Sequence, residues 1–164
     1  MRGAMIAFLP RLRRFCHALT AHPDDGDDLM QATVERALSR SHLFDQGSRI
    51  DSWMFRIAQN LHIDTLRATR RRGITVPVDE LLPLPGEDGR TLTENRSSLA
   101  AAQAALATVP DDQRAAFVLV VVEGLSYREA AETLGVPIGT IMSRLARARA
   151  RIEAALAERE GGEA

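Results

Sequence analysis

Apolar residues recur at helical intervals in two stretches of the chain, residues 1–72 and 99–160. Neither stretch shows the strict alternation that is typical of a β-strand. In residues 73–98 the helical pattern lapses, and proline and glycine recur. We therefore predict an all-α protein with two small helical domains, at 1–72 and 99–160, joined by a flexible linker at 73–98.

A first amphipathic helix is expected over residues 27–38. Asp28, Gln31 and Glu35 fall on its exposed polar side. The opposite face carries the apolar residues Leu29, Met30, Val34, Ala37 and Leu38.

A second helix is expected after a loop at 44–50, with its cap at Asp51 or Ser52. Three large apolar residues recur every four positions on this helix and are predicted to face inward: Trp53, Ile57 and Leu61. This position favours a core role for the tryptophan over stacking on a nucleic-acid base. A different, partly basic face carries Arg56, Asn60 and Arg67.

The segment 123–152 has the pattern of a helix-turn-helix. Ser126 and Glu129 form a capping box at the start of its first helix. Ala131 is small where the two helices cross, and Gly135 suits the left-handed conformation at the turn. Pro137 prevents continuation of the first helix and favours the first turn of the next.

The helix that follows the turn has two distinct faces. Its predicted inward face consists of Ile141, Leu145, Ala148, Ile152 and Leu156, and its outward face of Thr140, Arg144, Arg147 and Arg151. We expect its N-terminal end to enter the major groove, where Thr140, Ser143 and Arg144 reach base edges. Phosphate contacts are expected from Arg147, Arg149 and Arg151. The combined pattern predicts DNA binding.

Charge is distributed unevenly around a formal net charge of -1. An acidic cluster at 24–28 contrasts with basic clusters at 67–72 and 144–151. All 21 basic residues are arginine. Two explanations account for this composition: a GC-rich genome, or a need for planar, bidentate phosphate contacts.

The remaining composition predicts a cytoplasmic protein. Cys16 is the single cysteine, so it cannot form an internal disulfide, and it suits a reducing compartment. The apolar run at 4–9 is too short for a signal peptide, and no segment reaches the roughly 20 apolar residues of a membrane span. We expect neither export nor membrane insertion.

No motif for catalysis or for a cofactor is found. The chain has no phosphate-binding glycine loop and no convincing catalytic triad, and its four histidines lack the spacing of a zinc site. We therefore predict a protein that is not an enzyme and that needs no cofactor or metal.

Three blocks of the sequence together resemble the extracytoplasmic-function (ECF) group of the sigma-70 family of bacterial RNA polymerase sigma factors. The first block, 27–38, is similar to the helix of family region 2 that docks on the clamp of the polymerase β′ subunit. The resemblance implies core-polymerase contacts at Asp28, Gln31 and Glu35.

The second block, 52–72, resembles the part of region 2 that engages and melts the promoter minus-ten element. This implies DNA contacts from Arg56, Asn60, Arg67, Arg70 and Arg71. In the family the preceding loop helps to form a pocket for an extruded base, which points to Gly47, Ser48 and Arg49.

The third block, 106–149, resembles region 4, which binds the minus-thirty-five element and the polymerase β flap. Met142 departs from the basic residue that family members often carry there. The family's linker is acidic and threads the RNA exit path, and here the acidic residues are Asp79, Glu80, Glu87, Asp88 and Glu94. A plain solvated tether fits this segment equally well.

The resemblance thus implies an alternative sigma factor that binds core RNA polymerase, recognises and opens promoter DNA, and is regulated by an anti-sigma factor. Two alternatives remain. A helix-turn-helix repressor would use only the C-terminal half, as a dimer on a palindromic site. A sigma-like decoy would bind an anti-sigma protein without acting on DNA, although no receiver-like domain accompanies the sigma-like regions.

Overall fold

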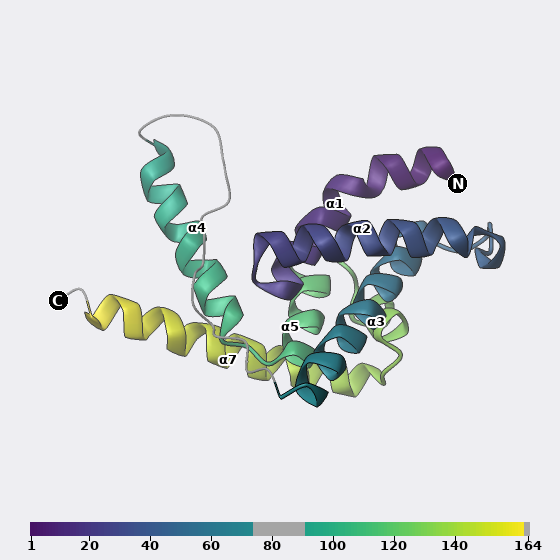
Figure 1. Ribbon diagram of the computed structural model, residues 1–164. Coiled ribbons are helices and arrows are strands. Elements are labelled where there is room, and N and C mark those ends of the chain that lie inside the picture. The colour runs from purple at the N-terminus through teal and green to yellow at the C-terminus, as the bar shows by residue number, and fades with distance from the viewer. Residues whose placement is uncertain (74–90, 163–164) are drawn as a thin grey trace.

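The structure is a computed structural model that describes residues 1–73 and 91–162, with side chains from residue 96 onward in the second range. Every regular element in these two ranges is a helix (Figure 1). The predicted all-α class is therefore confirmed. Most of the predicted linker, with Asp79, Glu80, Glu87 and Asp88, lies outside the described residues. The next helix begins at Thr91 and not at Leu99, so Glu94 lies on this helix.

The N-terminal half is a bundle of three long helices: α1 (Arg2–Thr20), α2 (Pro23–Ser39) and α3 (Ile50–Arg71). Ala21 ends α1 in a left-handed conformation, and its N–H donates to His17 O. Pro23 is the first residue of α2. A backbone N–H at this position has no partner within the helix, so proline loses no hydrogen bond there. A short 3₁₀ turn, η1 (Ser41–Leu43), lies between α2 and α3.

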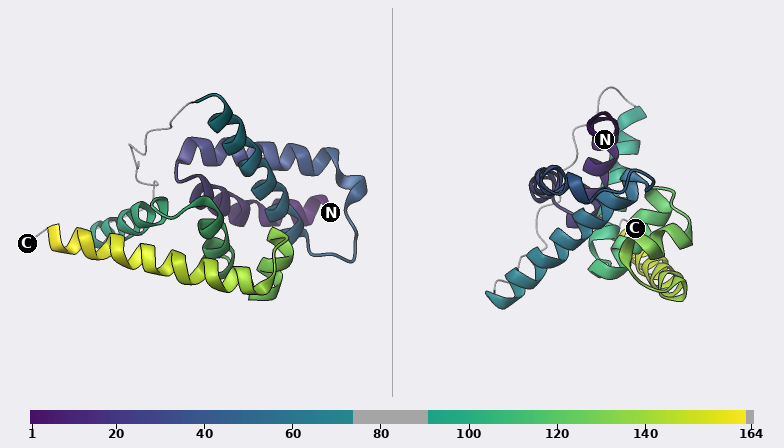
Figure 2. Two further views of the ribbon diagram at one scale, coloured as in Figure 1. Left: turned by 90° about the horizontal axis from the view of Figure 1, so that it is seen from below. Right: turned by 90° about the vertical axis from the view of Figure 1, so that its right-hand side faces the viewer.

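The C-terminal half contains α4 (Thr91–Ala107), α5 (Asp111–Phe117), α6 (Tyr127–Leu134) and α7 (Ile138–Gly162). Between α5 and α6 the chain forms a single π-helical segment, η2 (Val118–Val122). The long α7 packs against α4, α5 and α6. Its C-terminal end points away from α1, α2 and α3 (Figures 1 and 2).

On α2, the apolar face is largely as predicted. Leu29 and Ala37 are buried, but Leu38 is 47% exposed, so its predicted place in the core is wrong. Thr33 is buried on this face, and its hydroxyl donates to Leu29 O at 2.7 Å. That internal hydrogen bond satisfies the hydroxyl and makes a polar residue tolerable in the core.

On α3, the centre of the buried face lies one position beyond the predicted stripe. Met54, Phe55 and Ala58 are fully buried, and the predicted inward residues are only partly buried, at the edge of the core. Trp53 packs against Phe44, with ring centroids 5.0 Å apart. The tryptophan therefore has the core role that the sequence favoured.

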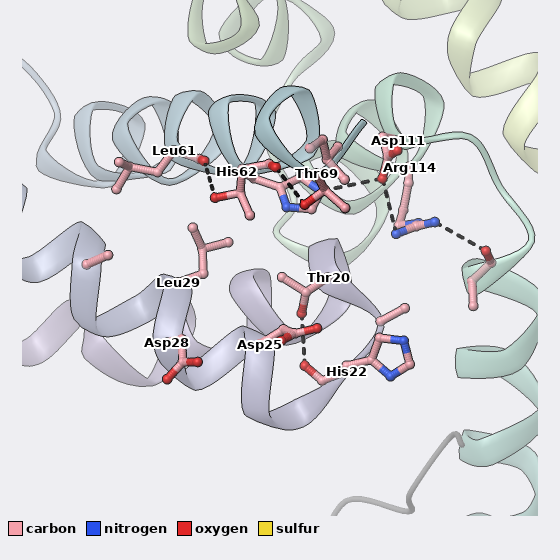
Figure 3. A pocket seen from close by; sticks show the side chains of 15 residues that line it. Thr20, His22, Asp25, Asp28, Leu29, Leu61, His62, Thr69, Asp111 and Arg114 are labelled. Atoms are coloured by element: carbon pink, nitrogen blue, oxygen red, sulfur yellow. Dashed lines mark hydrogen bonds and ion pairs between the residues drawn. The ribbon is translucent and has the colours of Figure 1, made fainter. Parts of the chain in front are cut away.

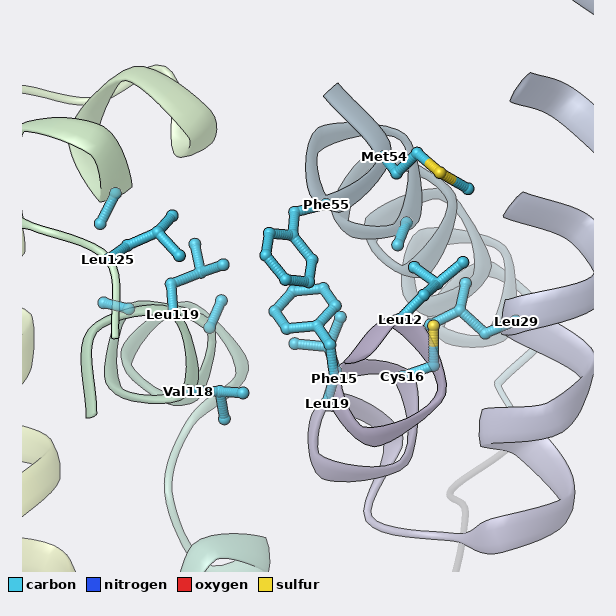
Figure 4. Packing of buried hydrophobic residues seen from close by; sticks show 14 of the residues in the cluster. Leu12, Phe15, Cys16, Leu19, Leu29, Met54, Phe55, Val118, Leu119 and Leu125 are labelled. Atoms are coloured by element: carbon cyan, nitrogen blue, oxygen red, sulfur yellow. The ribbon is translucent and has the colours of Figure 1, made fainter. Parts of the chain in front are cut away.

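The hydrophobic core is continuous between the two halves. The rings of Phe15 and Phe55 pack at a tilt, with centroids 4.6 Å apart, and face the side chains of Leu119 and Leu125 from the C-terminal half (Figure 4). Domains of about 60 to 70 residues bury only roughly 60% of their unfolded surface when they fold alone. The shared core adds to that buried surface.

Helices α1 and α2 approach each other closely at Gly26. A Cβ at this position would lie 2.9 Å from the Cα and 2.5 Å from the Cδ2 of His17. We predict that Gly26→Ala lowers the free energy of unfolding by about 1–3 kcal/mol, because a methyl group has to displace the backbone of α1. Urea unfolding followed by circular dichroism measures the change.

The matched control is Gly3→Ala, a second helical glycine with no atom within 4 Å of the added Cβ. This substitution should leave stability unchanged or raise it slightly, because alanine favours helix. Equal stability of the Gly26→Ala variant and the wild type would contradict the close packing of α1 and α2.

Candidate nucleic-acid interface

The helix-turn-helix is formed by α6 and α7, and its start is fixed by a complete capping box. Glu129 N–H donates to Ser126 Oγ at 3.1 Å, and Ser126 N–H donates to Glu129 Oε2 at 2.8 Å. Gly135 ends α6 with φ of 66°, in the left-handed region that costs glycine little. Ala131 is buried at the crossing with the neighbouring helices. These local features are as the sequence predicts.

The two faces of α7 also follow the sequence. Ile141, Leu145 and Ala148 are buried, and Ile152 and Leu156 are partly buried. On the other side, the side chains of Arg147, Arg149 and Arg151 are exposed. An exposed basic stripe along a helix that packs through its other face is suited to phosphate contacts.

The predicted base-reading residues at the start of α7 differ in their surroundings. Ser143 is exposed, and its hydroxyl donates to Thr140 O at 3.0 Å, while Thr140 is partly buried. Arg144 is 22% exposed and lies 3.6 Å from the carboxylate of Asp112 on α5. This guanidinium therefore already has an internal anionic partner.

The loop before α3 presents Gly47, Ser48 and Arg49 at the surface. Asp45 organises this loop, because its carboxylate accepts from Gly47 N–H at 3.0 Å and its carbonyl accepts from Ser48 Oγ at 2.7 Å. The guanidinium of Arg49 forms an ion pair with Asp51, with a shortest contact of 2.6 Å, and a second one with Glu129.

The predicted DNA contacts on α3 are all exposed: Arg56, Asn60, Arg67, Arg70 and Arg71. One of these side chains nevertheless forms hydrogen bonds within the protein. The guanidinium of Arg56 donates to the backbone carbonyls of Thr133, at 3.3 Å, and of Glu132, both at the C-terminal end of α6. The predicted minus-ten surface therefore contacts the helix-turn-helix.

The predicted polymerase contacts lie on the exposed face of α2. Asp28, Gln31 and Glu35 are all exposed, and Gln31 Nε2 donates to Glu35 Oε1 at 3.1 Å. They form a polar surface on one side of the N-terminal bundle.

A hollow of about 720 Å³ lies between α2, α3 and α5 (Figure 3). His62 and Asp111 meet at its edge, with Nε2 and Oδ1 3.4 Å apart. The hydrogen bond from His62, with the charges of Arg114 and Arg70, lowers the pKa of the Asp111 carboxyl, although burial opposes the shift. The cluster joins α3 to α5.

Sequence reasoning missed a buried charged cluster at the junction of the two halves. The Glu123 side chain is fully buried after η2 and accepts hydrogen bonds from Arg11 at 3.1 Å and from Arg14 at 2.8 and 3.0 Å. The hydrogen bonds that Arg14 donates to Glu123 raise the pKa of the Arg14 guanidinium. We call Glu123, Arg11 and Arg14 the Glu123 cluster. Since more than 100 residues separate its partners in sequence, no local signal indicates it.

A second missed residue, Arg114 on α5, is almost fully buried. It donates to Leu19 O and Val109 O at 2.8 Å each, and so joins α5 to the end of α1. Burial lowers the pKa of its guanidinium, and the charge of Asp111 opposes this effect. The residue is structural, because its donors are used within the protein.

Comparison with known families matches both halves of the chain. A family described as "Sigma-70, region 4" matches residues 99–152, and one described as "Sigma2 domain of PhyR" matches residues 5–59.

Relatives that match most of this chain are found as well. The ECF RNA polymerase sigma factor EcfG of Rhodopseudomonas palustris is 36% identical over 156 residues, which cover 95% of this chain and 84% of that protein. The ECF RNA polymerase sigma factor SigM of Mycobacterium tuberculosis is 33% identical over 87% of this chain and 69% of its own length. The ECF sigma factor SigE of Mycolicibacterium smegmatis is 34% identical, and the match covers 90% of this chain and 58% of that protein.

Solved structures with a similar fold are found as well. The sigma factor RpoE of Bartonella quintana, solved with the anti-sigma factor NepR, has a TM-score of 0.80 and 30% identity over 94% of this chain and 95% of that one. The anti-anti-sigma factor PhyR of the same organism shares the fold, with a TM-score of 0.62 and 19% identity over 92% of this chain and 48% of that one.

The fold and its helix-turn-helix define a regulatory protein of the sigma-70 class, built from region 2 and region 4. The chain belongs to the ECF family of RNA polymerase sigma factors, the proteins that direct the polymerase to promoters. The family resemblance predicted from the sequence is thus confirmed. No helix in residues 1–73 or 91–162 is long and apolar enough to cross a membrane.

Proposed function

We propose that this sigma factor reads the minus-thirty-five element with α7 and engages the minus-ten element with α3 and the loop before it. The observation that carries the proposal is the helix-turn-helix of α6 and α7, whose buried face anchors it while its arginine stripe stays exposed. In region 4, the DNA contacts are assigned to Thr140, Ser143, Arg144, Arg147 and Arg151. In region 2, they are assigned to Gly47, Ser48, Arg49, Arg56, Asn60, Arg67, Arg70 and Arg71.

The contact with core RNA polymerase is assigned to two surfaces. Asp28, Gln31 and Glu35 on α2 are proposed to bind the clamp of the β′ subunit, and region 4 to bind the β flap. The free energy of these contacts and of DNA binding drives promoter opening, and no nucleotide is hydrolysed. The protein therefore acts without catalysing a reaction itself.

In vitro run-off transcription tests this function. Purified core polymerase is combined with a library of promoters, with and without the protein. We expect new transcripts from a defined subset of templates that share paired minus-thirty-five and minus-ten motifs. Specific DNA binding without core-dependent transcription would instead favour a repressor.

A second candidate function is a decoy that binds an anti-sigma factor, and the match of residues 5–59 to the sigma-like domain of PhyR favours it. The same transcription experiment separates the two. A decoy would bind an anti-sigma protein and yield no transcripts with core polymerase on any template.

Two arginines of α7 are predicted to differ in their effect on DNA binding. Arg144→Ala should cost about 1–3 kcal/mol on the cognate site and relax specificity at one upstream base, because its guanidinium reads a base edge. Arg151→Ala should weaken binding to all sequences and flatten the salt dependence, because it contacts phosphate. Titration of matched and mutated promoter fragments at several salt concentrations measures both. Uniform losses from both substitutions would contradict the base-reading role of Arg144.

An anti-sigma factor is the proposed regulatory partner, and a groove of about 650 Å³ between α1 and α4 is proposed to receive it. Leu106, Phe117 and Ile152 give the groove an apolar lining, and Arg13 and Arg14 lie on its α1 side. An amphipathic helix with an apolar face and acidic flanks is complementary to such a surface. The related sigma factor RpoE was solved in complex with the anti-sigma factor NepR, which supports this proposal.

The groove is tested with purified NepR of Bartonella quintana as the probe. Ala102→Glu places a carboxylate in the lining and should weaken NepR binding at least tenfold in isothermal titration calorimetry, through charge repulsion and loss of apolar contact. Ala146→Glu, at an exposed position of α7 outside the groove lining, is the control and should bind as the wild type does. Unchanged binding of the Ala102→Glu variant would move the partner to another surface.

A further inference from the structure

The start of α7 carries a pair of exposed apolar side chains, at the end of the helix that is assigned to the major groove. Met142 is 55% exposed and Ile138 is 45% exposed. Because residues four positions apart lie one turn apart on the same side of a helix, the two side chains are neighbours. Every other large apolar residue in the described range of α7, 138–162, is buried or partly buried. The apolar pair is therefore not part of the face through which α7 packs.

The helix surface next to this pair is open. Gly139 follows Ile138 in the chain and lies one turn before Met142 and Ser143. A Cβ at Gly139 would meet no atom within 4 Å, so no close contact among the described residues requires a glycine here. Glycine disfavours a helix relative to alanine, and it is common where a ligand approaches the backbone closely. The position thus allows a partner to reach the helix between the two apolar side chains and Ser143.

The neighbouring polar residues fit DNA better than an apolar protein partner. Ser143 is exposed beside Met142, and Arg149 is exposed seven residues further along the same side of α7. A helix that docks in an apolar groove of another protein uses anchors at i, i+3 or i+4, and i+7. Here the residue at i+7 from Met142 is an arginine, which is suited to a phosphate that flanks a base. The apolar surface is therefore short and ends in a cation.

Thymine presents the apolar group that such a short surface can contact. In the major groove its C5-methyl group lies beside the O4 acceptor, whereas the other three bases present only hydrogen-bonding groups. A methionine side chain is flexible and polarizable, so it adapts to a methyl group, and isoleucine adds a stiff branched surface. Burial of one methyl group favours binding by about fourfold. This contact identifies a base without a hydrogen bond.

We propose that Ile138 and Met142 determine specificity by contacting the C5-methyl group of a thymine in the minus-thirty-five element. The inference rests on the proposed function, in which α7 reads this element, and it adds the identity of one base. It also gives a role to Met142, which stands where family members often carry a basic residue. A basic side chain binds the phosphate of any nucleotide, whereas a thioether discriminates between bases by their apolar surface.

Deoxyuridine tests the contact, because it differs from thymidine only by this methyl group and keeps every hydrogen-bonding group. The probe is a promoter fragment selected by the run-off experiment, in which each thymine of the minus-thirty-five element, on either strand, is replaced in turn. The full chain is assembled with core polymerase, and its affinity is measured by competition with a labelled fragment. We expect a position at which deoxyuridine weakens binding about three- to fivefold.

The central variant combines Ile138→Ala with Met142→Ala, two exposed positions at which alanine favours the helix. It should bind the thymine and deoxyuridine fragments equally. A general loss of stability would weaken both fragments and keep their ratio, so the ratio reports the methyl contact alone. Ile6→Ala is the matched control, because it shortens a 68% exposed side chain on α1, outside the helix-turn-helix, and it should keep the wild-type ratio.

Met142→Lys provides a second, independent measurement. The variant regains the basic residue that is common in the family, so it should bind all fragments more tightly at low salt. The slope of log affinity against log salt should become steeper by about 0.9, because one more phosphate is neutralised. The deoxyuridine effect should fall below about twofold, because the thioether is absent.

The outcomes separate this inference from the proposed function. Specific binding by the wild type with no position sensitive to deoxyuridine, or a minus-thirty-five element without an A·T pair, would overturn the inference alone. A deoxyuridine effect that persists in the double variant would also overturn it, by moving the methyl contact to other residues. Weaker binding of the double variant to core polymerase without DNA would assign the pair to a protein partner instead. Absence of both specific binding and transcription contradicts the proposed function and the inference with it.

Discussion

The packing of the two halves against each other depends on the buried carboxylate of Glu123, which binds Arg11 and Arg14 of α1. The chain brings it there through the π-helical segment η2, in which Glu123 N–H donates to Val118 O at 2.9 Å. Gly124 then turns the chain with φ of 74°, and Leu125 enters the core beside Phe55. A π-helical turn inside a helix is uncommon and often marks a functional site. Here it places the Glu123 carboxylate where Arg11 and Arg14 of α1 neutralise its charge.

Features that depend on neighbours within one or two helical turns could be predicted from the sequence. The capping box at Ser126, the turn at Gly135 and the inward face of α7 are all found where the pattern places them. Each is determined by backbone geometry over a few residues, and the three in order specify a helix-turn-helix. The family resemblance added the roles of the two halves, which periodicity alone does not provide.

Features that depend on long-range contacts could not be predicted in this way. Arg11 and Arg14 look like solvated residues of an amphipathic helix, and only the fold brings them to Glu123. On α3 the apolar period was right but its centre was displaced, because Phe55 faces the C-terminal half and the predicted stripe borders the core. Leu38 is exposed near the end of α2. Thr33 lies in the core of the same helix, because its hydroxyl donates to Leu29 O and so needs no other partner.

The use of arginine as the basic residue throughout the chain connects stability with recognition. A guanidinium binds carboxylates, helix C-terminal carbonyls and phosphates with the same planar set of donors, whereas the ammonium of lysine acts as a point charge. Arg56 binds backbone carbonyls of α6, and Arg144 pairs with Asp112, so both arginines have internal partners that resemble their proposed DNA partners. Salt weakens the exposed contacts of both kinds, but it has less effect on the buried Glu123. The contact between the two halves through Glu123 is thus less sensitive to salt than the exposed contacts of Arg56 and Arg144.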